Sequence, residues 1–295
     1  MERKRLTSTC IGCVVKANLN KHPLEISEEK KIEYKQRMLK IVSEAKDTDS
    51  SPVIVYRLDK LRTEMFGATT DYSEIKQYFN NYIMGKEKRI LPEIEKAEDP
   101  LLRGIQYALT GNYIDFGTLE KVSEESLEEL LKNAKDIVLD EAEYQALQKD
   151  LENARSLVFL HDNCGEIVFD HFLIKTLKKR YPNLEITSVV RGYPVLNDAT
   201  MEDAKQIGLT ETVSVIGNGS DIAGTCLDHI SEETLQLINK ADVVIAKGQA
   251  NFETMNGCGL NIYYLFMCKC MLFAERFHKK LFEGMLLNDK NTGDK

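Results

Sequence analysis

The segment 156–166, SLVFLHDNCGE, predicts the fold of the second half of the chain. Its first five residues, Ser156–Leu160, have the length and apolar character of a buried strand. A polar turn containing Gly165 follows, and then a helical stretch, Ile167–Arg180. An apolar strand that passes through a short turn into a helix is the repeating unit of a parallel sheet covered on both faces.

The same unit recurs along the chain. Further strand-length apolar segments are Ile186–Val190, Thr212–Ile216 and Asp242–Ala246, with a last candidate at Leu281–Leu287. The helical stretches that follow them are Ala199–Ile207, Glu232–Asn239 and Phe252–Phe273. Residues 156–295 are therefore predicted to form a doubly wound, mainly parallel α/β core.

Residues 1–155 have a helical pattern instead. Ser27 is a plausible N-cap, and Ser51-Pro52 places a proline in the first turn of another helix. Further helices are predicted from Asp71 or Ser73, over Leu101–Leu109 and over Glu124–Leu151. We therefore expect a helical N-terminal region or cap, 1–155, joined to the core at 156–295.

Composition limits the class of protein. The 295 residues are 43% hydrophobic and 29% charged, which is typical of a folded globular chain. With 39 basic and 47 acidic residues the formal charge is −8, which argues against a nucleic-acid partner. No apolar run reaches the roughly 18 residues of a membrane span, and the charged start leads into no apolar signal core. Seven cysteines then indicate reduced thiols in a soluble, cytoplasmic protein with no membrane partner. No feature indicates an oligomeric state.

Polar side chains follow the predicted strands at the point where each strand ends. They are Asp162-Asn163, Asn197-Asp198, Gly217-Asn218-Gly219 and Lys247-Gly248-Gln249. Ligands of such sheets bind beyond the carboxyl ends of the strands. Two carboxylates and an amide oxygen suit Mg²⁺ or Mn²⁺, and a lysine with exposed backbone N–H groups suits a phosphate. Together they predict phosphoryl chemistry.

Each of these residues also has an ordinary structural explanation. Asp198 alone reads as a helix cap, and Asn163 and Gly165 as turn residues. Glu166 and Lys247 alone read as exposed side chains. The functional interpretation depends on four successive strand ends meeting at one edge of the sheet.

Three motifs resemble those of a known family. They are Asp-Asn-x-Gly-Glu-x-x-x-Asp at 162–170, Arg-Gly-x-Pro-x-x-Asn-Asp-x-Thr at 191–200 and Lys-Gly-Gln-x-Asn-x-Glu at 247–253. With the early Cys10-x-x-Cys13 they resemble the damage-control phosphatases, also known as domain of unknown function 89. The cysteine pair resembles the stand-alone microbial branch rather than the branch described as carboxyl methyltransferases.

The resemblance implies a metal-dependent phosphatase that hydrolyses phosphate monoesters of small, often damaged, metabolites. Sugar phosphates, phosphopantetheine-like compounds and nucleotides all remain candidate substrates. By the resemblance Asp162, Asn163 and Asp198 bind a divalent ion, Mg²⁺, Mn²⁺, Co²⁺ or Ni²⁺. Lys247 holds the phosphate, and the residues that shape the site are Arg191, Asn197 and Asn251. Cys164 stands where the family often has alanine, which puts a thiol beside the site.

The catalytic route stays open at this point. Asp162 is a candidate nucleophile that would form an aspartyl-phosphate. The other route is a metal-activated water with Glu166 as the base. The Asp-x-Asp signature of haloacid-dehalogenase phosphatases is absent, since the strand is followed by Asp162-Asn163-Cys164.

Cys10 and Cys13 allow three interpretations: a Zn²⁺ site, a pair of ordinary thiols and a redox disulfide. A zinc site would need further ligands, for which Cys268 with Cys270, or His22, are candidates. Two functions from other classes also stay open for the whole chain. One is an S-adenosylmethionine-dependent carboxyl methyltransferase, and the other is a non-catalytic sensor of metals or metabolites.

Overall fold

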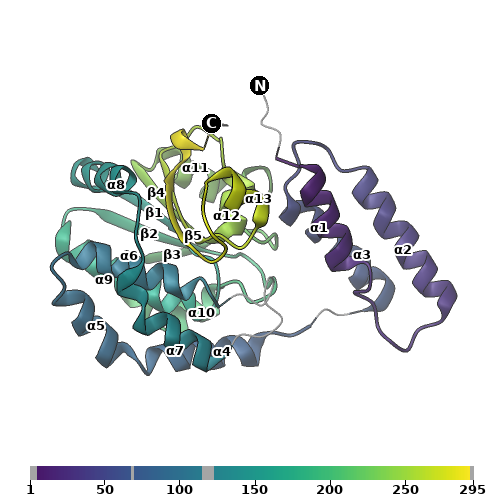
Figure 1. The fold of residues 1–295 in the computed structure, drawn as a ribbon, viewed down its shortest axis with the longest axis horizontal. Helices are drawn as coiled ribbons and strands as arrows, with labels where there is room; N and C mark the ends of the chain where they lie inside the picture. The colour runs from purple at the N-terminus through teal and green to yellow at the C-terminus, as the bar shows by residue number, and fades with distance from the viewer. Residues whose placement is uncertain (1–4, 68–69, 115–122, 293–295) are drawn as a thin grey trace. The chain divides into compact units, whose positions relative to one another are not determined.

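The computed structural model describes residues 5–67, 70–114 and 123–292, and the chain divides into two compact units, Met1–Asp71 and Tyr72–Lys295. Figure 1 shows the helices of the first unit in purple and the sheet of the second in teal to yellow. No helix in the described part of the chain is both long enough and apolar enough to cross a membrane.

The described residues of the first unit form three helices, α1 (Ser8–Asn18), α2 (Glu28–Ser43) and α3 (Ser51–Phe66). The Ser27 side chain accepts a hydrogen bond from the backbone N–H of Lys30, and Pro52 lies in the first turn of α3. These contacts confirm both predicted helix starts. The buried side chains of this unit form a separate apolar core around Tyr34 and Leu58.

The second unit is built on a six-stranded sheet. The strands are β1 (Ser156–Leu160), β2 (Glu185–Val190), β3 (Ser214–Gly217), β4 (Val243–Lys247), β5 (Ile262–Met267) and β6 (Gly284–Asn288). Their order is β3-β2-β1-β4-β5-β6, and only β6 runs antiparallel to its neighbour. This arrangement confirms the predicted α/β class with a mainly parallel sheet.

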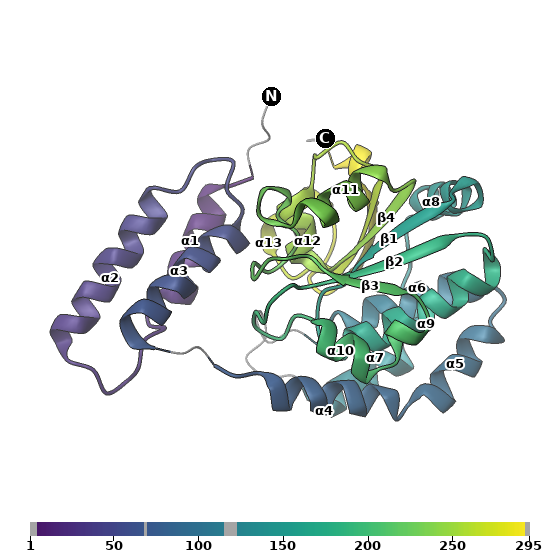
Figure 2. The same cartoon turned by 180° about the vertical axis from the view of Figure 1, so that it is seen from behind.

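Helices cover both faces of the sheet, as Figures 1 and 2 show. Before β1 come α4 (Ser73–Met84), α5 (Glu87–Glu95), α6 (Pro100–Gly111), α7 (Glu124–Lys132) and α8 (Glu141–Asn153). After β1 come α9 (Glu166–Arg180), α10 (Met201–Gln206), α11 (Glu232–Lys240), α12 (Gly248–Met255) and α13 (Met271–Arg276). One apolar cluster joins α6 and α9 to one face, and another joins α11, α12 and α13 to the other.

The compact units divide at residue 71, whereas the change in sequence texture lies at 155. The helices described between residues 72 and 155, α4 to α8, belong to the same unit as the sheet. Helix α6 packs closely on α9, since a Cβ on Gly111 would lie 2.6 Å from Phe169 Cδ2. Helical periodicity shows which face of a segment is buried, but not which core it joins.

The expected single helix over Phe252–Phe273 is wrong. Helix α12 ends at Met255, β5 occupies Ile262–Met267, and α13 begins at Met271. Gly257 and Gly259 lie between α12 and β5 with φ of +78° and +82°, which ends the helix. The sequence of β5, IYYLFM, is rich in the aromatic and branched residues that favour a buried strand.

Candidate active site

Neighbouring strands end in register at one edge of the sheet. Leu160 of β1 pairs with Val189 of β2 and Ala246 of β4, and Val190 of β2 pairs with Gly217 of β3. Continuing this register past the strand ends aligns Asp162 with Arg191 and Gly248, and Arg191 with Asn218. These four positions follow directly after the strands, at the carboxyl edge of the sheet. We call Gly248, Asp162, Arg191 and Asn218 the edge row.

Arg191 connects the two carboxylates predicted to bind metal. Its Nη2 lies 3.4 Å from Asp162 Oδ1, and its Nε donates to Asp198 Oδ2 over 2.6 Å. The loop after β2 carries Asp198 back to β1, where it forms an isolated bridge with Asn163. The exposed fractions of Asp162, Asn163 and Asp198 are 5%, 3% and 4%. The structure thus brings the three predicted ligands together in a buried cluster.

Asn163 uses its amide nitrogen to hold neighbouring carboxylates. Its Nδ2 donates to Asp162 Oδ2 over 2.7 Å and to Glu166 Oε2 over 3.3 Å. The Asn163 carbonyl oxygen is therefore the atom of this side chain that is suited to bind a cation.

Gly248 is shaped by its contact with Asp162. Its φ is +78°, and a Cβ there would lie 1.9 Å from Asp162 Oδ2. Only glycine fits both the backbone conformation and the space. The glycine after β4 therefore leaves space for the Asp162 carboxylate, which follows β1.

Asn112 is a site residue that sequence reasoning missed. Its Nδ2 donates to Glu166 Oε2 over 2.9 Å and to Asp162 Oδ2 over 3.3 Å, and its Oδ1 accepts from the backbone N–H of Met267. It follows directly after α6, where a lone asparagine reads as a helix cap. No sequence signal distinguishes it from such a cap, because its partners lie 50 or more residues away.

Lys247, the last residue of β4, is fully buried and its Nζ points toward α6 and α9. Its Nζ donates to Glu166 Oε1 and Asp170 Oδ1, each over 2.6 Å, and to the carbonyl of Ala108 over 3.0 Å. Burial lowers the pKa of Lys247, but the carboxylates of Asp170 and Glu166 together raise it by more than burial lowers it. The net pKa is therefore above the ordinary 10.5. The predicted phosphate contact would require Lys247 to release one of these acceptors, because an ammonium has three hydrogens.

His161 orients the carboxylate of Asp170, which Lys247 binds. Its Nδ1 lies 2.9 Å from Asp170 Oδ2, and its Nε2 lies 3.0 Å from Ser188 Oγ. All three side chains are at most 1% exposed. Glu166, the predicted base, is likewise fully buried, between Lys247 and Asn112.

Asn251 and Asn197 support the site through backbone contacts. Asn251 donates to the carbonyls of Lys247 and His161, over 2.6 and 3.2 Å, so it joins the ends of β4 and β1. Asn197 donates to the Ile114 carbonyl over 3.2 Å. Both are buried near the edge row, and their predicted role toward substrate stays a prediction.

Cys164 is not a reactive thiol in this environment. It is fully buried, and burial raises its pKa to about 12. A thiol with so high a pKa is protonated at neutral pH and is a poor nucleophile and metal ligand.

Cys10 and Cys13 lie in α1 of the first unit, and both are free thiols. Cys10 Sγ accepts from Thr7 Oγ1 over 3.2 Å. Across the described ranges, no three His, Cys, Asp or Glu side chains are grouped to hold a metal. The predicted set at the strand ends contains only two such residues, Asp162 and Asp198, since its third member is an asparagine. A zinc ion at the cysteine pair stays a prediction.

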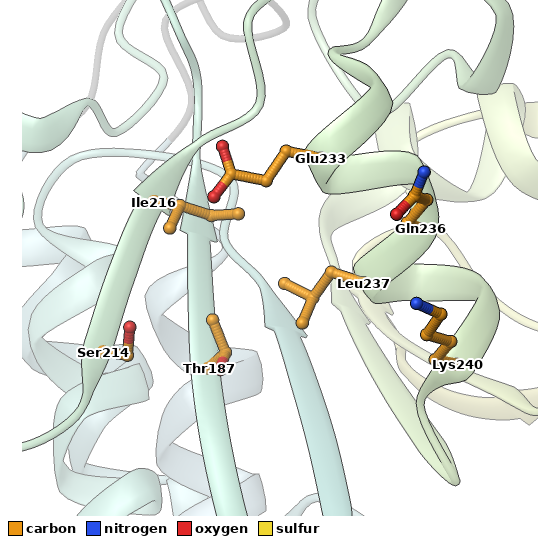
Figure 3. Close-up of a pocket in the computed structure, with 7 residues that line it drawn as sticks. All are labelled: Thr187, Ser214, Ile216, Glu233, Gln236, Leu237 and Lys240. Atoms are coloured by element: carbon orange, nitrogen blue, oxygen red, sulfur yellow. The ribbon is translucent and has the colours of Figure 1, made fainter.

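A surface groove of about 440 Å³ lies away from the edge row (Figure 3). Its walls are residues of β2, β3 and α11: Thr187, Ser214, Ile216, Glu233, Gln236, Leu237 and Lys240. None of the predicted site residues lines it, and Thr187 lies in the middle of β2 rather than at its carboxyl end.

Comparisons with known proteins agree with this architecture. A crystal structure of a domain of unknown function 89 protein from Pyrococcus horikoshii matches with a TM-score of 0.79 at 24% identity, covering 96% of this chain and 99% of that one. This likeness concerns the fold.

Three curated relatives match in sequence. A protein from Archaeoglobus fulgidus named damage-control phosphatase is 31% identical over 79% of this chain and 81% of its own length. A damage-control phosphatase from Pyrococcus horikoshii is 35% identical over 63% of this chain and 64% of its own. An uncharacterised protein from Methanocaldococcus jannaschii is 34% identical over 73% and 72%. Residues 6–284 match the model of the damage-control phosphatase ARMT1-like domain, and the chain belongs to that family.

Proposed function

We propose that this protein is a metal-dependent phosphatase that hydrolyses phosphate monoesters of small metabolites such as sugar phosphates. The observation that carries the proposal is the buried cluster in which Arg191 contacts both Asp162 and Asp198, with Asn163 beside them. Two curated relatives named damage-control phosphatase support the same chemistry.

The donor set fits a divalent cation. Asp162, Asn163 and Asp198 would hold the ion through oxygen atoms, the ligands that Mg²⁺ and Mn²⁺ prefer. Co²⁺ and Ni²⁺ are further candidates. The buried charged groups of the site are four carboxylates, of Asp162, Glu166, Asp170 and Asp198, and two cations, of Arg191 and Lys247. Their net formal charge of −2 is what one divalent ion would neutralise.

A bound divalent ion would supply positive charge to the phosphate oxygens as the P–O bond breaks. Arg191 would add a fixed positive charge where negative charge accumulates. Lys247 would act through Glu166 and Asp170, whose carboxylates it holds in place. Asp162 as nucleophile and Glu166 as base for a water are both retained as routes, because both carboxylates belong to this cluster.

The test is a hydrolysis assay on chelator-treated protein with p-nitrophenyl phosphate and a series of sugar phosphates. Each metal, Mg²⁺, Mn²⁺, Co²⁺ or Ni²⁺, is added back separately. We expect metal-restored turnover that Asp162→Ala and Asp198→Ala abolish, while Glu202→Ala, an exposed acid of α10, leaves it unchanged. Metal-stimulated turnover that survives both site substitutions would refute the assignment.

The routes and the alternative functions are separated by two further measurements. If Asp162 is the nucleophile, rapid acid quenching should trap phosphate on the protein. Glu166→Gln should then slow only the hydrolysis of that aspartyl-phosphate by water. Calorimetry with S-adenosylmethionine tests the methyltransferase, for which we expect no binding. Binding of phosphate esters without turnover under every metal would favour the sensor.

A further inference from the structure

Two buried nitrogen atoms of the edge row have no hydrogen-bond partner. They are Arg191 Nη1 and Asn218 Nδ2, and the exposed fractions of these residues are only 1% and 0%. A buried donor without an acceptor is costly, and native proteins rarely keep one without a reason. Two such donors at neighbouring positions of one row call for a common explanation.

The orientation of Asn218 is fixed by its other atom. Its Oδ1 accepts from the backbone N–H groups of Gly192 and Ser220, over 2.8 and 2.9 Å. Exchanging the amide oxygen and nitrogen would turn Nδ2 toward two donors, so this assignment is the favourable one. Nδ2 therefore points away from these two N–H donors and has no acceptor of its own.

Arg191 is held in the same way. Its Nε and Nη2 contact Asp198 and Asp162, which leaves Nη1 without a partner. Two carboxylates thus fix the plane of the guanidinium and with it the direction of the remaining donor.

The loops after β2 and β3 hold these two residues rigidly. A Cβ on Gly192 would lie 2.4 Å from the backbone nitrogen of Gly219, so the two loops pack against each other without space. The Asn218 carbonyl accepts from the N–H of Ser231, which ties the loop to the start of α11. A donor on such a loop is positioned before any ligand arrives.

We propose that Arg191 Nη1 and Asn218 Nδ2 form an anion seat that binds oxygen atoms of the substrate's phosphate. Both atoms are donors and one is charged, so the seat suits an anion and excludes a cation. Phosphate offers several acceptor oxygens, and Arg191 already contacts the two carboxylates of the metal cluster. This inference rests on the proposed function, to which it adds Asn218 as a substrate-binding residue.

The seat also assigns a position to the bound ester. The phosphate lies over the ends of β2 and β3. Lys247, at the end of β4, already has three acceptors of its own. We therefore assign the phosphate contact to Asn218 and Arg191 rather than to Lys247.

The experiment measures binding of inorganic phosphate to Mg²⁺-loaded full-length protein by calorimetry, which needs no turnover. Asn218→Asp keeps the acceptor for Gly192 and Ser220 but replaces the donor, and Asn218→Ala removes both. Ser220→Ala is the matched control, because it removes a hydroxyl of the same loop, which accepts from the N–H of Ile222, and keeps the donor. Thermal unfolding and Mg²⁺ titration are recorded for each variant.

We expect phosphate affinity to fall about tenfold or more in both Asn218 variants, as for loss of a hydrogen bond to a charged group. Ser220→Ala should bind phosphate like wild type, and Mg²⁺ affinity should stay unchanged in Asn218→Ala. If Asn218→Asp does not fold, Asn218→Ala carries the comparison.

Three results would overturn the seat. Wild-type affinity in Asn218→Ala would mean that the donor holds only water. An equal loss of phosphate affinity in Ser220→Ala would mean that the integrity of the loop matters instead of the donor. Absence of phosphate binding by wild type would mean that phosphate is not the ligand of these two donors. Failure of the proposed function gives a different pattern: phosphate binds through Asn218, but no ester is hydrolysed under any metal.

Discussion

Gly248 lies so close to Asp162 that a Cβ on the glycine would stand 1.9 Å from the Asp162 Oδ2 atom. The two residues follow adjacent parallel strands, β4 and β1, at aligned positions of the sheet. The carboxylate of Asp162 therefore occupies space that is open only because the residue after β4 is a glycine.

Gly248→Ala is expected to abolish turnover and destabilise the fold, because the methyl group would displace Asp162 in addition to straining a backbone with φ of +78°. The matched control is Gly259→Ala, where φ is +82° but nothing lies within 4 Å of the added carbon. That control should cost only about 1–2 kcal/mol of backbone strain and keep its activity. Activity assays and thermal unfolding of both variants check this, and equal loss of activity in both would contradict it.

Lys247→Met should destabilise the protein by about 3–5 kcal/mol, because it leaves the buried carboxylates of Glu166 and Asp170 without their cation. Denaturant unfolding measures the free energy, with exposed Lys240→Met as the control. A Lys247→Met protein as stable as wild type would refute the account.

The contribution of Lys247 to stability also has a defined pH range. Its pKa in the folded state is raised, so its stabilisation is fully present below the ordinary value of 10.5 and is lost as the pH rises above it. On the alkaline side, the difference in unfolding free energy between wild type and Lys247→Met should therefore narrow only above about pH 10.5. A difference that narrows between pH 7 and 9 would contradict this sign.

The buried His171 should make the stability of the protein depend on pH in mildly acidic solution. Burial, with a smaller effect from Lys175, lowers the pKa of His171 from 6.5 to about 4, and its Nε2 lies 2.8 Å from Thr212 Oγ1. A lowered pKa in the folded state means that stability is present above pH 6.5 and is lost as the pH falls toward 4. Wild type should therefore lose about 3 kcal/mol of unfolding free energy between pH 6.5 and 4 through His171. His171→Gln should not show this loss. Unfolding between pH 4 and 7 tests it, and exposed His229→Gln should behave like wild type.

Asn112→Ala should lower metal affinity or turnover about 10- to 100-fold, as expected for a residue that orients a ligand without binding the metal itself. The cause is loss of the Nδ2 contacts to Glu166 and Asp162. Asn133→Ala, which removes another asparagine from a helix C-terminus, is the control. Metal titration and kinetics should separate the two variants; identical behaviour would show that Asn112 acts only as a cap.

Much of the second unit could be predicted from local sequence. The apolar strand Ser156–Leu160 and the polar turn after it indicated a parallel sheet, and its carboxyl edge indicated where Asp162, Asn163 and Asp198 meet. These predictions succeed because strand polarity and alternation act over a few residues. Strand β5 was missed, since a short apolar aromatic run is compatible with either a helix or a strand.

The sequence by itself determined the class of fold, the edge of the sheet that carries the polar cluster and the residue types suited to a divalent ion. Only the tertiary structure decided that residues 72–155 belong to the sheet unit, that Asn112 joins the cluster and that Lys247 pairs with Glu166 and Asp170. The physical reason is that periodicity and turn chemistry depend on near neighbours along the chain. Partners such as Lys247 and Ala108 lie 139 residues apart and meet only when whole elements pack.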